Sequence, residues 1–124
     1  MNKVPNGVYL QLPFPDAILN PNKHVHWAKK NKARVSMREA GYYLALETGV
    51  KLDPEKRYDV NLVFCPPDHR DRDLDNLTSS MKSALDGICR GLGVNDKMIR
   101  PIPDWGPVVE RGKVEIRFVE RIGT

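Results

Sequence analysis

Alternation of apolar and polar side chains along the chain predicts β-strands in three places. Residues 7–12 (GVYLQL) and 57–65 (RYDVNLVFC) alternate with the period of two that a half-buried strand requires. Prolines follow each of these runs and mark its end. Residues 98–102 and 112–119 predict a short extended piece and a terminal strand, separated by the turn-rich segment PDWGP.

Two other stretches have the spacing of helices. Between residues 36 and 47 apolar side chains recur at helical intervals, with Ser36 as the expected N-cap and Glu39 at the reciprocal capping position. Residues 75–91 repeat apolar side chains at steps of three and four, and Gly91 and Gly93 supply the stop. Residues 14–33 show no clean period and predict a long loop or short helical turns.

The resulting order, β, α, β, α, β, predicts the α/β class, with a small mixed sheet packed against two main helices. At 124 residues the chain is expected to form a single domain over residues 1–124. A chain of this size buries roughly two-thirds of its unfolded surface, so folding requires neither a disulfide nor a metal.

Composition places the chain among ordinary globular proteins, with 40% hydrophobic and 29% charged residues. No apolar run approaches the roughly 18 residues of a membrane span, and the first residues lack the apolar core of a signal peptide. We therefore expect a cytoplasmic protein with no membrane partner. Cys65 and Cys89 fall in apolar patterns and are interpreted as buried thiols, which argues against a disulfide or a zinc site.

The strongest chemical feature is the heptapeptide RDRDLDN at residues 70–76. If this segment is extended, Asp71, Asp73 and Asp75 project to one side, where their charges repel one another. A divalent cation, protonation or neighbouring arginines would relieve that repulsion. A structural interpretation stays open, because Asp75 or Asn76 could simply cap the helix that begins there.

A calcium loop of the EF-hand type fails at two positions. With Asp71 as position one, Asn76 stands where the turn requires glycine, and Lys82 stands where a bidentate glutamate belongs. Magnesium is the better candidate, because it usually takes one or two protein carboxylates and completes its shell with water and a phosphate oxygen.

A basic segment suggests where such a phosphate would come from. Residues 22–38 contain no Asp or Glu and carry six cationic side chains: Lys23, Lys29, Lys30, Lys32, Arg34 and Arg38. A loop with this charge suits a nucleic-acid backbone, because neutralised phosphates release condensed counterions. Arg70 and Arg72 are further candidate contacts, although a charge run is commonly just a solvated face.

Other side chains of the basic segment are ambiguous. Trp27 would either stack on an exposed base or anchor the loop to the core. His24 and His26 lack metal-ligand spacing to a third residue and are interpreted as phosphate contacts. Lys82, seven residues beyond Asp75, would reach back toward a phosphate or remain an ordinary surface lysine.

Four segments form a wider pattern along the chain: Leu12-Pro13-Phe14-Pro15, Arg72-Asp73-Leu74-Asp75-Asn76-Leu77, Ala84-Leu85-Asp86 and Asn95-Asp96. In these segments the chain resembles the RusA family of Holliday junction resolvases, over nearly its full length. One departure is Ser79, which stands where the family often has a lysine; Lys82, three residues later, is the candidate to replace it.

The resemblance implies a RusA-like, homodimeric endonuclease that resolves four-way DNA junctions by paired symmetric nicks during recombination and repair. It implies Asp73, Asp75 and Asp96 as catalytic ligands of Mg²⁺, with Mn²⁺ as a substitute, and Lys82 as a catalytic cation. Two alternatives stay open: a metal-free DNA-binding regulatory module, and a nuclease that acts on flaps or forks. Asp71 lies outside the family's acidic set.

Overall fold

Four strands form one mixed sheet in the computed structural model, which describes residues 7–122. They are β1 (Gly7–Leu12), β2 (Tyr58–Cys65), β3 (Ile99–Trp105) and β4 (Lys113–Glu120). Their spatial order is β1-β4-β2-β3. Strand β4 pairs antiparallel with β1 and with β2, whereas β2 and β3 are parallel, as expected when the connection between them contains helices.

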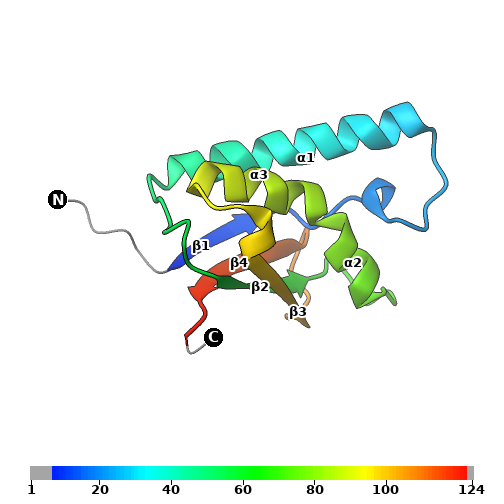
Figure 1. The fold of residues 1–124 in the computed structure, drawn as a ribbon. Helices are drawn as coiled ribbons and strands as arrows, with labels where there is room; N and C mark the ends of the chain where they lie inside the picture. The colour runs from blue at the N-terminus through cyan, green and yellow to red at the C-terminus, as the bar shows by residue number, and fades with distance from the viewer. Residues whose placement is uncertain (1–6, 123–124) are drawn as a thin grey trace.

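The helices are α1 (Trp27–Glu47), α2 (Leu74–Ser80) and α3 (Lys82–Leu92), with short 3-10 helices η1 (Ala17–Leu19) and η2 (Asp96–Met98). Helices α1 and α3 lie side by side over one face of the sheet (Figure 1). The strands turn alternate side chains toward them. Tyr58, Val60, Leu62 and Phe64 of β2 are fully buried there, so the core lies between the sheet and these two helices.

Glycines allow α1 and α3 to approach closely. A Cβ atom on Gly87 would lie 1.9 Å from the carbonyl oxygen of Arg38, and one on Gly91 would lie 2.5 Å from the Cβ of Ala45. The two backbones therefore sit closer together than side chains at these positions would permit. This contact fixes the position of Arg38 over α3.

The predicted strands are confirmed, apart from their ends, but β3 is longer than expected. It continues to Trp105 and includes three residues that the sequence assigned to a turn. Pro101 and Pro103 are tolerated because β3 is an edge strand, bonded only to β2.

The predicted start of the first helix is wrong. Helix α1 begins at Trp27, and the Nδ1 atom of His26, not the hydroxyl of Ser36, caps it by accepting a hydrogen bond from the Ala28 N–H at 3.2 Å. Gly41 and Ala45 are its buried residues, both in its second half. In the first half no side chain is fully buried, so the sequence there has no strong apolar period and resembled a loop.

The second predicted helix is two helices. The chain breaks at Met81, with φ −85° and ψ −4°. Just before the break, the hydroxyl groups of Thr78 and Ser80 each donate to the carbonyl oxygen four residues earlier, both at 2.8 Å. Such bonds compete with the helical ladder and bend helices, which accounts for the division into α2 and α3.

The broader predictions agree with the structure. The chain forms a small single-domain α/β fold, and Cys65 and Cys89 are free, buried thiols. Burial raises the pKa of the Cys89 thiol to about 12, with the charges of Asp96 and Asp86 adding to the effect. Within residues 7–122 no helix has the length and apolar character needed to cross a bilayer.

Candidate nucleic-acid and metal site

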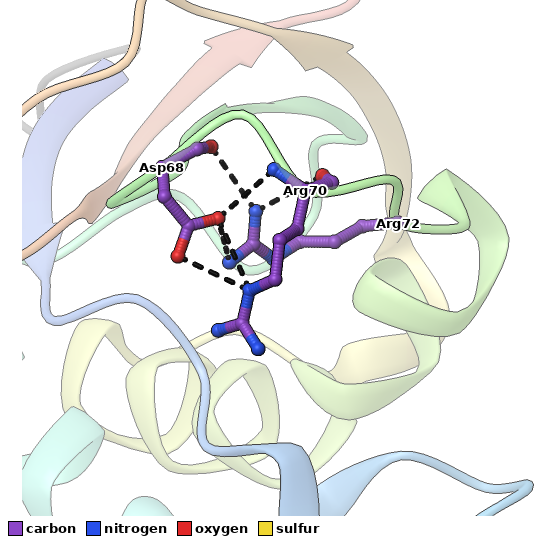
Figure 2. Close-up of polar contacts among 3 residues, drawn as sticks. All are labelled: Asp68, Arg70 and Arg72. Atoms are coloured by element: carbon purple, nitrogen blue, oxygen red, sulfur yellow. Dashed lines mark hydrogen bonds and ion pairs between the residues drawn. The ribbon is translucent and has the colours of Figure 1, made fainter.

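The loop between β2 and α2 is organised by Asp68, which the sequence analysis did not single out. Figure 2 shows its carboxylate between two arginines of the motif. It accepts hydrogen bonds from the backbone N–H of Arg70 at 3.0 Å and from the Nε of Arg70 at 3.2 Å, and it lies 2.8 Å from an Nη atom of Arg72. The backbone hydrogen bond, followed by the arginine side chains, lowers the pKa of Asp68 to about 2.

The two arginines differ in how much of the guanidinium group remains free. Arg72 is 16% exposed; it donates to the carbonyl oxygens of Asp68 and Arg70, both at 3.2 Å, and lies over the ring of Phe14. Arg70 is 80% exposed and engages Asp68 through its Nε atom. Arg72 thus holds the loop in place, and Arg70 is the one available to an incoming phosphate.

Asp73 is the residue that caps α2, and not Asp75 or Asn76. Its Oδ1 atom accepts the N–H groups of Asp75 at 2.9 Å and of Asn76 at 3.1 Å. The backbone is extended at Asp73 but helical from Leu74 onward. The expected row of three alternating carboxylates therefore ends at Asp73, and Asp75 projects from the first turn of the helix.

Three cavities border this region, and the third, of about 310 Å³, shares Ser79, Lys82, Asp86 and Asp96 with the second. The first, here called the aspartate cavity, has a volume of about 440 Å³. Asp71 and Asp73 line it together with Arg70, Arg72 and Arg111, the last of which reaches it from the turn between β3 and β4. Asp71, whose role the sequence left open, thus lies beside Asp73.

The second, here called the serine cavity, has a volume of about 600 Å³ and lies between α1 and the break that separates α2 from α3. It is lined by Ser79, Ser80 and Ser83, by the cations Arg34, Arg38 and Lys82, and by Asp86 and Asp96. The structure therefore brings together Lys82, Asp96 and Arg34, which are far apart in the sequence. Ser80 borders both cavities.

The three predicted metal ligands are not gathered at one point. Asp73 lines the aspartate cavity and Asp96 the serine cavity. Asp75 lines neither, although it lies one helical turn before Ser79, on the same face of α2. Across residues 7–122, no three side chains of His, Cys, Asp or Glu form a group that could hold a metal ion.

The expected basic loop is largely the first half of a helix. Lys29, Lys32 and Arg34 are exposed on α1, and Lys23 is exposed just before it. Lys30 instead has a local structural contact, since its Nζ atom donates to the carbonyl oxygens of Asn20 at 3.0 Å and of Lys23 at 3.3 Å.

The aromatic and imidazole side chains of this segment also have defined positions. Trp27 is 72% exposed, so the interpretation that it anchors the segment to the core is wrong. Its stacking on a base remains a prediction. The side chain of His26 caps α1, as described above, whereas His24 is exposed in the loop before this helix.

Several features of this region were not predicted from the sequence, for different reasons. Asp68 had a usable signal, because an aspartate two residues before Arg70 can close an Asx turn. Arg38 and Asp86 form an ion pair at 3.1 Å although they are 48 positions apart in the chain, so no local sequence pattern predicts it. Arg111 stands in a turn with a positive φ of 66°, which its sequence neighbours do not reveal.

Comparisons with known proteins add one relative. No protein-family model matches the chain. An uncharacterized protein from Xylella fastidiosa (strain Temecula1) is 35% identical to it over 96 residues, which cover 71% of this chain and 60% of that protein. The chain therefore spans about three-fifths of the length of the relative that it matches, and the similarity brings no activity with it.

Proposed function

We propose that this protein is a Mg²⁺-dependent endonuclease of the RusA kind that cleaves four-way DNA junctions as a homodimer. The observation that carries the proposal is that the acidic side chains of the site are exposed and make no ion pairs among the described residues. Asp71, Asp73, Asp75 and Asp96 are all exposed, and none of them takes part in an ion pair among the described residues.

The rival structural interpretation requires the aspartates of the motif to pair with its arginines. Arg70 and Arg72 pair with Asp68 instead, and Asp71 and Asp75 make no ion pair with any of the described residues. Capping accounts for Asp73 alone. Exposed carboxylates concentrated in this way favour a cation, and their oxygen atoms are the ligands that Mg²⁺ prefers.

The exposed aspartates therefore offer the carboxylate oxygens that Mg²⁺ prefers, although no three of them form one group among the described residues. Mg²⁺ commonly binds one or two protein carboxylates and fills its shell with water and substrate phosphate, so the proposal needs no closed protein cage. Asp73, Asp75 and Asp96 would be the protein ligands of the ion; because Asp73 and Asp96 line different cavities, the three would come together only once the ion and a DNA phosphate are bound. Bound there, the ion would polarise the scissile phosphodiester and lower the pKa of a bound water.

The remaining side chains have roles of their own in the proposal. The exposed guanidinium of Arg70 and the ammonium of Lys82 would contact phosphate oxygens, where negative charge develops during cleavage. Lys29 and Lys32 extend the positive surface along α1. Their place near its N-terminus opposes the helix dipole, and a DNA backbone would relieve that unfavourable arrangement. A twofold dimer would supply two equal sites for paired nicks.

The decisive assay incubates the protein with a labelled four-way junction, a matched duplex and a flap, with and without Mg²⁺. We expect paired cuts in the junction only when Mg²⁺ is present. Cleavage of the flap in preference to the junction would favour the flap nuclease instead. Binding that does not depend on Mg²⁺, with no strand scission, would favour the metal-free DNA-binding module. We keep this alternative because no three-residue metal group is present within residues 7–122.

Asp75→Asn tests the carboxylates directly. We expect cleavage to fall by at least about 100-fold, while junction binding is retained or strengthened because a negative charge near the phosphates is removed. Glu55→Gln is the matched control, since Glu55 is exposed in the turn before β2 and outside both cavities. Circular dichroism checks folding; an unfolded Asp75→Asn variant would indicate a structural role for this residue.

A further inference from the structure

The serine cavity has a charge balance that differs from that of the aspartate cavity. Arg38 and Asp86 neutralise each other, with Arg38 Nε 3.1 Å from an Asp86 carboxylate oxygen. The remaining charged groups that line the cavity are Arg34, Lys82 and Asp96, so the cations outnumber the acids by one. Neither Arg34 nor Lys82 takes part in an ion pair among the described residues.

One wall of this cavity is held rigidly. Arg38 lies on α1 one helical turn after Arg34, and its carbonyl oxygen packs where a Cβ of Gly87 would otherwise stand. Its Nε atom is buried and makes no hydrogen bond of acceptable geometry, although it lies close to Asp86. The close contact of α1 with α3 therefore fixes the backbone of α1 that carries Arg34 and Arg38.

The opposite wall carries donors suited to an anion. Ser79 and Ser83 present hydroxyl groups on either side of the helix break, and neither is engaged in a side-chain hydrogen bond among the residues described. Helix α3 begins at Lys82 with no side-chain cap, so the positive end of its dipole lies beside the cavity that Lys82 and Ser83 line.

From these features we propose that the serine cavity binds a single phosphate group, with Arg34 and Lys82 as its charged contacts and Ser79 and Ser83 as hydroxyl donors. The inference rests on the proposed action on DNA for the source of the phosphate, which is a backbone phosphodiester next to the cleavage site. Arg38 and Asp86 neutralise each other and do not themselves carry the ligand. Asp96 faces the same space, so its charge opposes the phosphate whenever no divalent cation is present.

The test measures phosphate binding and junction binding with the same set of variants. Inorganic phosphate is titrated into the protein in metal-free buffer while backbone amide resonances are followed by NMR. Junction affinity is measured over a range of salt concentrations in EDTA, which prevents cleavage. The variants are Arg34→Gln/Lys82→Gln, Asp96→Asn and the control Arg90→Gln, since Arg90 is exposed on α3 and lines neither cavity.

For the wild type and Arg90→Gln we expect phosphate to shift the amide resonances of residues 79–83. In the double variant phosphate affinity should fall at least about tenfold, and the slope of log K against log salt for the junction should decrease by about two. Asp96→Asn should bind phosphate more tightly.

Two results would overturn the inference. Phosphate binding by the double variant equal to that of Arg90→Gln would remove the cavity as the site. Weakened phosphate binding with unchanged junction affinity would show that free phosphate or a nucleotide, and not DNA, is the ligand. If instead the wild-type protein neither binds nor cuts any DNA substrate, the proposed function fails. The phosphate titration would still show whether the serine cavity binds phosphate.

Discussion

At the scale of single residues, Asp68 shows how one side chain prepares a site without belonging to its motif. Its carboxylate holds Arg70 and Arg72, and this leaves the neighbouring aspartates without arginine partners. The arrangement stabilises the loop only while Asp68 is ionised. Because its pKa is lowered from 3.8 to about 2, this stabilisation is complete above pH 3.8 and is lost as the pH falls toward 2.

Asp68→Asn should therefore lower the midpoint of urea unfolding at neutral pH, where the carboxylate contributes fully. The difference from the wild type should shrink as the pH falls from 3.8 toward 2, because the wild-type carboxyl becomes protonated over that range. Glu55→Gln, whose carboxyl makes no ion pair among the described residues, controls for the loss of one negative charge. A difference that stays constant down to pH 2 would contradict the role given to Asp68.

At the scale of elements, the contact between α1 and α3 decides the geometry of the serine cavity. Gly87 allows the backbones to meet at Arg38, and Gly91 allows Ala45 to pack directly on α3. Helix propensity alone would favour alanine over glycine within α3, by about 1 kcal/mol. The glycines are therefore explained by packing and not by local preference.

Gly87→Ala separates these two effects, because they have opposite signs. Its new Cβ atom would meet the carbonyl group of Arg38, with the oxygen at 1.9 Å, and the backbone nitrogen of Tyr42. All of these are backbone atoms, so the helices must move apart. We expect a loss of about 1–3 kcal/mol in the free energy of unfolding, measured by urea denaturation. Arg90→Ala on the same helix is the control; a Gly87→Ala protein more stable than the wild type would mean that propensity outweighs the clash.

At the scale of the whole molecule, basic side chains and cavities lie toward one end of the helical layer. The first half of α1 carries the basic side chains. The aspartate and serine cavities share Ser80, the last residue of α2. The net charge of +4 thus understates the local positive field, since acids and bases are unevenly distributed. This distribution supports the proposal that the partner is a nucleic acid.

Replacing both Lys29 and Lys32 by glutamine tests whether the positive surface of α1 binds DNA. Both are exposed and make no ion pair among the described residues, so the fold should be unaffected. Binding to junction and to duplex should weaken alike, and the slope of log K against log salt should fall by about two, as measured by fluorescence anisotropy. An unchanged slope would place α1 outside the DNA interface. Lys30 is left intact because it bonds to the backbone.

The sequence by itself determined the strands and the position of the acidic motif, because alternating burial and proline breaks are local properties. Strands β1 and β2 were found almost to the residue. It did not determine where α1 begins, since Lys29 and Lys32 lie on a part of the helix that no sheet covers and that therefore shows no apolar period.

Only the tertiary structure decided which charges meet. Arg38 pairs with Asp86 across 48 positions of the chain, and this ion pair depends on the packing of α1 against α3. The meeting of Arg34, Lys82 and Asp96 in one cavity depends on the packing of α1 against α3 and on the connection that leads to β3. Such contacts join distant segments, and their energies come from proximity in space, which no local pattern of residues encodes.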